Sequence, residues 1–259
     1  MSAPWTTGEG RFLILPRQAG SPERGCGPGF DEETGADVLI TVSGLQESTA
    51  QTLRASLAPD VPGVSRLLHV GPVDGQPLWA LVEELPPDAA PVGERRGDPL
   101  PTGEVARLVA RIGDAIRQAH ARGRPLVGLR PELVFRGPDA VMVAPRCEPF
   151  LTTAARPCTG QLPVFPRVYL SPEALALRPV DERSDVFSLC AMAAAWVTGV
   201  HPFEETTLMA HVMAIASGSP GRLPDPWDGP LRAGMARDPA ARIRVDALLE
   251  QVARLEHDP

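Results

Sequence analysis

Cysteine and histidine are the residue types in this sequence that most often act as nucleophiles, proton carriers or metal ligands. No two cysteines form a CxxC pair, and no histidines have the HxH or HExxH spacing of zinc sites. We therefore expect free thiols in a reducing compartment, and histidines that are surface or helix residues rather than ligands. These residues are Cys26, Cys147, Cys158 and Cys190, and His69, His120, His201, His211 and His257. The sequence predicts neither a zinc site nor a disulfide framework.

The overall composition is that of an acidic globular protein. The 259 residues carry a formal net charge of −7, and 43% of them are hydrophobic and 22% charged. The sequence has no dense run of Lys and Arg, which argues against a nucleic-acid-binding surface. No apolar run reaches the roughly 18 residues of a membrane span, and the first residues do not have the pattern of a signal peptide. We expect a cytoplasmic protein with no membrane span and no nucleic-acid partner.

The elements that must position any site change character near residue 102. Before it, short apolar runs separated by turns predict strands and one short helix, and after it apolar positions recur with helical spacing. The predicted strands lie within 11–16, 37–42 and 65–85, the short helix at 52–57, and the later helices at 103–121, 183–199, 206–218 and 244–258. Thr102 and Gly123 are of types that cap the start and end of the first long helix. The architecture is α+β, with a small β-rich part followed by a larger helical part.

Several segments of the second half follow one another in an order and spacing typical of one protein family. They are AIRQAHARG (115–123), LVGLRPELVF (126–135), VYLSPEAL (168–175), DERSDVFSLCAMAAAWVTGVHPF (181–203) and LRAGMARDPAARIRVDALLE (231–250). Together they resemble the eukaryotic-type, or Hanks-type, Ser/Thr protein kinase family, in the form of a degenerate bacterial member. The resemblance implies one bilobal, protein-kinase-like α+β domain. It implies a β-rich N-lobe with one helix at 1–86, a hinge or linker at 87–102 and a helical C-lobe at 103–259.

The resemblance assigns structural roles to three charged residues. Glu173 matches the glutamate of the A-P-E motif, and Arg242 matches the late arginine that pairs with it. Asp185 matches the aspartate of the central helix, which accepts hydrogen bonds from the catalytic-loop backbone. We expect Glu173 and Arg242 to form a substantially buried ion pair, in which removal of one partner costs about 3–5 kcal/mol.

The positions that carry phosphoryl-transfer chemistry in the family hold residues that cannot perform it here. The reaction needs a base for the incoming hydroxyl, oxygen ligands for Mg²⁺ and a cation on the phosphates. By the resemblance, Gly128 stands at the catalytic aspartate, Leu133 and Pro145 at the two metal ligands, and Thr41 at the strand lysine. Asp139 fits a turn better than a displaced metal ligand. The resemblance therefore predicts no catalytic residue and no bound metal.

Nucleotide binding is a separate question, because backbone groups can hold adenine without any catalytic residue. By the resemblance, Glu83, Glu84 and Leu85 are the hinge candidates, and Val82 resembles the residue that borders the adenine. The glycine-rich loop is degraded, and Glu23 stands in the span where backbone amides should cradle phosphate. We expect no cofactor, and Mg-ATP binding that is weak or absent.

What remains is a function by binding. We predict a pseudokinase that acts as a scaffold or allosteric regulator of a protein partner in intracellular signalling. The partner would be an active Ser/Thr kinase or a signalling or biosynthetic enzyme. The alternative is an atypical Ser/Thr kinase, or a nucleotide-dependent transferase, that uses non-standard cleft residues.

The Pro-rich segment at 145–170 corresponds to the family's activation segment. It is either a packed loop or a partner-docking surface, in which phosphorylation of threonine would add charge and reorganise the loop. The candidate residues for docking or phosphorylation are Thr152, Thr153, Thr159, Phe150, Phe165 and Tyr169.

Overall fold

The computed structural model describes residues 5–15, 25–44, 47, 50–51, 61–93, 95, 97–126, 128–144, 169–176, 178–205 and 207–255. The chain divides into two compact units. The first comprises Met1–Ala90 and Phe135–Pro149, and the second comprises Pro91–Val134 and Phe150–Pro259. The predicted division at 1–86, 87–102 and 103–259 stays a prediction.

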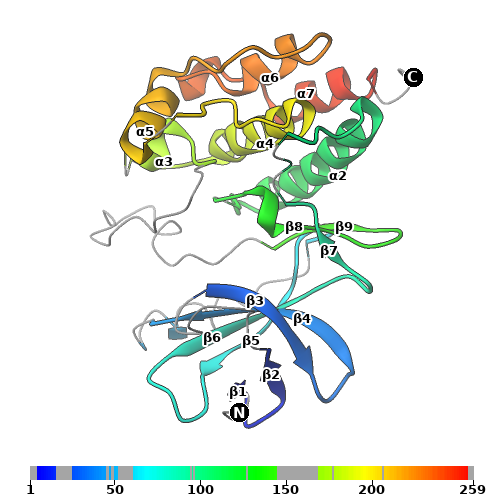
Figure 1. Ribbon diagram of the computed structural model, residues 1–259, viewed down its shortest axis with the longest axis vertical. Coiled ribbons are helices and arrows are strands. Elements are labelled where there is room, and N and C mark those ends of the chain that lie inside the picture. Colours follow the sequence, from blue (N-terminus) through cyan, green and yellow to red (C-terminus); the bar gives the residue numbers. More distant parts are fainter. Residues whose placement is uncertain are drawn as a thin grey trace. The chain divides into compact units, whose positions relative to one another are not determined.

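A six-stranded antiparallel sheet, in the order β1-β2-β3-β4-β6-β5, forms most of the first unit (Figure 1). Its strands are β1 (Trp5–Thr7), β2 (Phe12–Ile14), β3 (Gly25–Asp31), β4 (Ala36–Ser43), β5 (Leu67–Pro72) and β6 (Trp79–Glu84). In β4, Val38, Ile40 and Val42 alternate with other residues, and this period of two places all three on one face. They pack with Phe12 and Val82 in a buried cluster. The predicted strands are confirmed, whereas the helix candidate at 52–57 lies outside the described residues.

The two edges of this curved sheet meet through β1. Thr7 forms an antiparallel bridge with Val73, which follows β5, and the Asp74 amide donates to the Thr6 carbonyl at 2.8 Å. The Thr7 hydroxyl is buried and donates to the Pro72 carbonyl at 2.6 Å. Edge strands normally leave backbone groups unpaired. Here β1 therefore covers backbone groups just beyond the β5 edge, and the sequence had not indicated this contact.

A second, three-stranded sheet has the order β7-β8-β9. Its strands are β7 (Ala90–Pro91), β8 (Val134–Arg136) and β9 (Val141–Val143), and the short 3-10 helix η1 (Pro131–Leu133) comes directly before β8. Val143 also pairs with the chain before β5, because the Ser65 amide donates to its carbonyl at 2.8 Å.

The second unit is mainly helical (Figure 1). Its helices are α2 (Thr102–His120), α3 (Pro172–Leu175), α4 (Glu182–Thr198), α5 (Leu208–Ser217), α6 (Asp228–Gly234), η2 (Pro239–Ala241) and α7 (Val245–Val252). α2 buries one apolar stripe, whereas α4 is buried on nearly all sides from Ser184 to Trp196. α2 packs against α4 and α7. α4 is thus the core of the unit, and the predicted helices are confirmed, although the last one ends at Val252.

The ends of α2 differ from the sequence-based prediction. Pro101 is the N-cap and Thr102 is already helical, so no side chain caps this end. At the other end the C-cap is Ala121, and Gly123 takes a left-handed conformation (φ 67°) two residues later. Pro is a natural neighbour of a helix start because its fixed φ suits the first turn and it has no amide hydrogen to satisfy.

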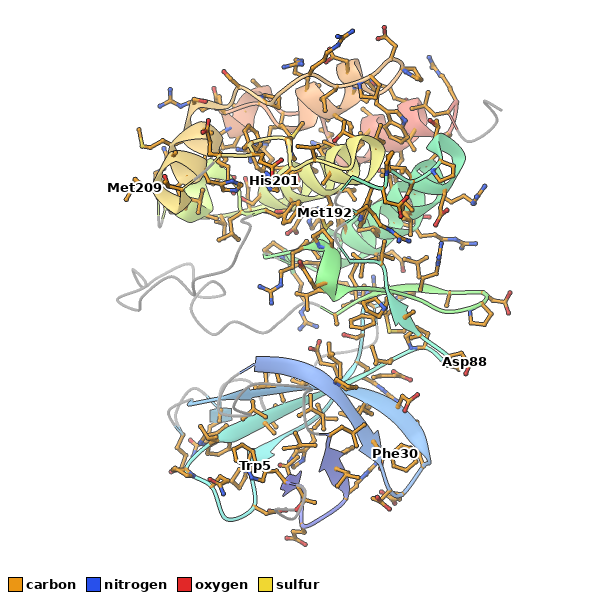
Figure 2. The ribbon with its side chains drawn as sticks, in the orientation of Figure 1. Trp5, Phe30, Asp88, Met192, His201 and Met209 are labelled. Carbon is orange, nitrogen blue, oxygen red and sulfur yellow. The ribbon has the colours of Figure 1, made fainter. Side chains whose placement is uncertain are left out.

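Methionine occurs in both the interior and the surface of the second unit (Figure 2). Met192 on α4 is fully buried, whereas Met209 and Met213 on α5 are 71% and 62% exposed.

Among the described residues, no helix combines the length and apolar character needed to cross a bilayer.

Candidate functional site

The loop that leads from α2 to η1 is held by a buried carboxylate on α4. Asp185 is fully buried, and its Oδ2 accepts a hydrogen bond of 2.7 Å from the Leu126 amide. The same oxygen lies 2.8 Å from Nε2 of His120, at the end of α2. Hydrogen bonds to an ionised group are stronger than neutral ones. Asp185 therefore fixes the start of the loop and also connects it to α2.

The structure places Gly128 and Leu133 in this loop without any functional group. Gly128 has a φ of 85°, a conformation that side chains other than hydrogen rarely adopt. Leu133, at the end of η1, is only 2% exposed, and Leu129 is 1% exposed. The loop therefore uses its side chains to fill the core and offers neither a base nor a metal ligand at these two positions.

Thr41 lies on β4, where it pairs with Leu81 of β6. Its Oγ1 is buried and has no hydrogen-bond partner among the described residues. A neutral hydroxyl cannot supply the positive charge that a lysine would place on phosphate. Pro145, which the resemblance places at the second metal ligand, lies outside the described residues.

The register of β4 and β6 decides which residues share a face with Thr41. Ile40 pairs with Val82, and both belong to the core cluster of the sheet. Because successive side chains of a strand point to opposite faces, Val82 lies on the face opposite Thr41. The resemblance of Val82 to the residue that borders the adenine stays a prediction. Glu83, paired with Leu39, lies on the same face as Thr41.

The hinge candidates are engaged in contacts within the first unit. Glu83 is 4% exposed, and its Oε1 accepts a hydrogen bond of 2.8 Å from the Ser65 hydroxyl. The Glu84 amide donates to the Arg66 carbonyl at 2.8 Å, and the two side chains form an ion pair at 3.4 Å. Leu85 follows β6 and is half-buried. The Glu84 amide therefore already has a hydrogen-bond acceptor within the first unit. The burial of Glu83 was not predicted from the sequence.

Glu173 and Arg242 form a two-pronged ion pair between α3 and the segment before α7. Arg242 Nη1 and Nη2 donate to the two carboxylate oxygens at 2.6 and 2.7 Å. The Ser184 hydroxyl donates to the same carboxylate at 2.6 Å. Burial by itself raises the pKa of Glu173, but the hydrogen bonds from Arg242 and Ser184 outweigh it and lower the pKa to about 2.

The activation-segment candidates are almost all beyond the described part of the chain. Thr152, Thr153, Thr159, Phe150 and Phe165 lie outside it. Tyr169 is described, and it is 3% exposed.

The surroundings of Tyr169 contain two buried histidines that the sequence did not single out. The Tyr169 carbonyl accepts a hydrogen bond of 2.8 Å from Ser188, and its ring lies edge-on to His201. His201 and His211 are 2% and 6% exposed, with ring centroids 4.4 Å apart. The expectation that the histidines are surface or helix residues is therefore wrong for His201, which lies in the turn after α4. The apolar residues that flank this turn in the sequence could have indicated that His201 is buried.

The described histidine, cysteine and carboxylate side chains do not gather at one place. Within the described ranges, no three His, Cys, Asp or Glu side chains come together as a metal site would require. Cys190 is fully buried, and burial raises the pKa of its thiol to about 12, so it is not a ready nucleophile.

Comparisons of the sequence with known proteins find relatives among the serine/threonine-protein kinases. No protein-family model matches the chain. The chain is 33% identical over 165 residues to the serine/threonine-protein kinase Pkn1 of Myxococcus xanthus, an alignment that covers 61% of this chain and 24% of that protein. It is 28% identical over 186 residues to the serine/threonine-protein kinase PknD of Mycobacterium tuberculosis, with 66% of this chain and 25% of that protein covered. The chain thus spans about a quarter of the length of these relatives.

A likeness in structure extends over nearly the whole chain. The crystal structure of Rad53 1–466 in complex with AMP-PNP matches with a TM-score of 0.69 and 17% sequence identity, and covers 95% of this chain and 66% of that one. At this identity the match shows the fold. The chain thus has a bilobal, protein-kinase-like α+β fold, and the sequence relatives support a likeness to the Hanks-type Ser/Thr protein kinases.

Proposed function

We propose that the chain is a pseudokinase, a catalytically inactive protein-kinase-like protein. It acts as a scaffold or allosteric regulator by binding a protein partner in intracellular signalling. The observation that carries the proposal is the burial of Leu133, which is 2% exposed at the position of a metal ligand. A hydrocarbon side chain that fills the core has no oxygen to offer Mg²⁺.

Two further positions support the loss of phosphoryl transfer. Gly128 has no side chain with which to accept a proton, and Thr41 cannot carry a positive charge. Loss of a general base alone typically lowers the rate by roughly 10²–10⁴. The base, a metal ligand and the cation are replaced together. Because such groups act as a unit in catalysis, we expect the remaining groups to give no phosphoryl transfer.

The retained polar contacts support a role for the folded surface. Asp185 still holds the loop, and the ion pair of Glu173 with Arg242 is complete. A buried ion pair needs good geometry and additional hydrogen bonds to offset its desolvation, and here Ser184 supplies one of them. A fold that keeps these contacts while lacking phosphoryl-transfer groups favours a function by binding.

A phosphotransfer assay tests the proposal. The purified chain is incubated with radiolabelled ATP, Mg²⁺ or Mn²⁺, and general protein substrates, beside an active Ser/Thr kinase. We expect no incorporation above background. The matched variant is Asp139→Asn, which removes an exposed carboxylate in the β8–β9 turn. Turnover that this substitution abolishes would overturn the proposal and favour the atypical kinase.

Nucleotide binding is tested separately by thermal unfolding. A ligand present at about 100 times its Kd stabilises a protein by about 2.7 kcal/mol, which is readily seen as a higher melting temperature. We expect no such rise with ATP, with or without Mg²⁺, relative to Mg²⁺ alone. A clear rise with ATP would count against the predicted weak or absent binding.

Partner binding is tested through the activation segment. The full chain and a variant with Thr152, Thr153 and Thr159 changed to alanine are incubated with an active Ser/Thr kinase. They are then used to capture partners from the native cell for mass spectrometry. We expect the variant to lose phosphate and to recover less of the partner. Equal phosphorylation and equal recovery would contradict the docking role of this segment.

A further inference from the structure

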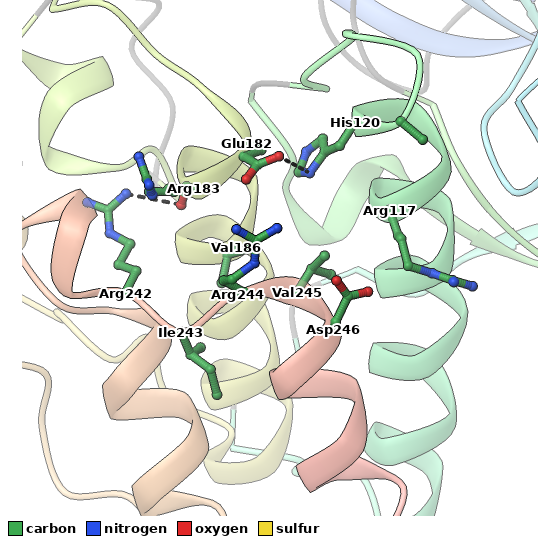
Figure 3. A pocket seen from close by; sticks show the side chains of 11 residues that line it. Arg117, His120, Glu182, Arg183, Val186, Arg242, Ile243, Arg244, Val245 and Asp246 are labelled. Carbon is green, nitrogen blue, oxygen red and sulfur yellow. Dashed lines mark hydrogen bonds and ion pairs between the residues drawn. The ribbon is translucent and has the colours of Figure 1, made fainter.

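A pocket of about 250 Å³ lies in the second unit, between the end of α2, the first turn of α4 and the start of α7 (Figure 3). It is smaller than the roughly 300–1,000 Å³ of sites that enclose drug-sized ligands. Apolar side chains of Val186, Ile243 and Val245 line part of it. Size and lining therefore suit a small ligand with an apolar portion.

Most arginines of the pocket form ion pairs with carboxylates that lie outside it. Three arginines in its wall each contact a carboxylate that does not line the pocket. These pairs are Arg117–Asp114 at 2.7 Å, Arg183–Asp181 at 3.1 Å and Arg242–Glu173 at 2.6 Å. Arg244 and Asp246 remain, and neither has an ion pair or side-chain hydrogen bond with any residue that the structure describes. Within the described part of the chain, the pocket thus has one cation, Arg244, and one carboxylate, Asp246, that lack an ion pair and are exposed to solvent.

Arg244 stands where its charge is unfavourable for the helix. It is the N-cap of α7 and makes no side-chain capping bond. The N-terminal end of a helix carries a partial positive charge, so a cation there is disfavoured whereas an acid is favoured. The partial positive charge at the start of α7 therefore explains an acidic residue at Asp246, in the first turn, but does not explain a cation at Arg244. Glu182 lies across the pocket at 3.8 Å from His120 and adds a second carboxylate (Figure 3).

The geometry points to a binding site for a small zwitterion with an aliphatic portion, that is, a free amino acid such as leucine. Its carboxylate would pair with Arg244, its ammonium group with Asp246 and Glu182, and its side chain with the apolar lining. Charge-assisted hydrogen bonds of this kind give both orientation and specificity.

The pocket is connected to the loop that holds Gly128. His120 lines the pocket, and its Nε2 lies 2.8 Å from Asp185 Oδ2, the atom that accepts the Leu126 amide. A ligand that contacts Glu182 or His120 could therefore affect the loop through the buried carboxylate of Asp185. The site is independent of the proposed function, but it would give a pseudokinase a metabolite-controlled input.

The experiment follows the imidazole resonances of the full, isotope-labelled chain by NMR, with His120 assigned through His120→Gln. L-leucine is compared with N-acetyl-L-leucine, which lacks the cation, and with L-leucinamide, which lacks the carboxylate. We expect a saturable shift of His120 with leucine. Each analogue should bind at least about tenfold more weakly, the cost of one charged hydrogen-bonding partner.

Two matched variants test the contacts of the ligand's carboxylate and of its ammonium group separately. Arg244→Gln should weaken the binding of leucine and N-acetyl-leucine by about tenfold and leave that of leucinamide unchanged. Asp246→Asn should weaken the binding of leucine and leucinamide by about tenfold and leave that of N-acetyl-leucine unchanged. Arg222→Gln, an exposed arginine outside the pocket, should change nothing. The absence of a saturable leucine shift overturns the inference. So does N-acetyl-leucine binding as tightly as leucine, or wild-type affinity in both pocket variants.

Discussion

Two regions of the second unit make opposite use of the positions that the kinase family fills with polar residues. Glu173 and Arg242 keep the charges of the family's ion pair, and both are buried and hydrogen-bonded. Around Gly128 and Leu133 the polar groups are replaced by a hydrogen atom and a buried hydrocarbon. By the resemblance, the difference separates positions that hold the fold from positions that take part in phosphoryl transfer. It predicts that substitutions in the two regions fail for different reasons.

The largest expected effect comes from Arg242→Met. The variant leaves the Glu173 carboxylate buried without its cation, and breaking a buried pair in this way costs about 3–5 kcal/mol. The measurement is urea-induced unfolding at neutral pH. The matched control is Arg232→Met, which breaks an exposed pair with Asp228 of similar length, 2.7 Å. Exposed pairs contribute about 0–1 kcal/mol. Equal losses in the two variants would contradict the role assigned to burial.

The pH dependence of unfolding sharpens this prediction. The pKa of Glu173 is lowered from an ordinary value of 4.5 to about 2 in the folded protein. Its stabilising contribution is therefore fully present above about pH 4.5 and lost as the pH falls toward about 2. We expect the stability difference between wild type and Glu173→Gln to shrink over this interval. A difference that stays constant would show that the carboxylate charge does not stabilise the fold.

The loop gives the next largest effect, through Leu133→Asn. Restoring the family's amide should destabilise the protein by about 3 kcal/mol, because it leaves a cavity and buries an unsatisfied polar group. Leu133→Met is the control, since swaps that conserve volume usually cost less than about 1.5 kcal/mol. Urea unfolding and a Mg-ATP melting assay are measured together. An asparagine variant that is fully stable and gains Mg-ATP binding would show that the position remains open to a metal.

The fold and part of the site were predictable because their signals are local. Glu173, Asp185 and Arg242 each lie in a short motif, and the resemblance of these motifs to the kinase family implied their partners. Contacts between distant residues carried no such signal. The pairing of His120 with Asp185 and the return of β1 to Val73 each join residues about 65 apart in sequence. The face of Val82 depends on strand register, and a shift by one residue reverses it.

A smaller effect is expected in the first unit, from Thr7→Val. The hydroxyl of Thr7 is buried and donates to the Pro72 carbonyl at 2.6 Å, where β1 meets the end of β5. Valine keeps the shape but leaves that carbonyl without this donor, at a cost of about 1–2 kcal/mol. Thermal and urea unfolding measure the loss, and Thr6→Val is the exposed control. Unchanged stability of Thr7→Val would mean that the contact of β1 with β5 contributes little.

The same substitution at Thr41 should have the smallest effect and the opposite sign. Thr41 Oγ1 is buried but has no hydrogen-bond partner within the described residues. An unmatched buried hydroxyl costs free energy, so Thr41→Val removes a penalty and should raise stability by about 1 kcal/mol. Both side chains are β-branched and suit a strand, and Thr7→Val serves as the matched comparison. If Thr41→Val instead destabilised the protein as much as Thr7→Val, the hydroxyl would have a partner. The position of the lost lysine would then serve a polar contact of its own, and the contrast between kept structure and lost chemistry would not extend to the first unit.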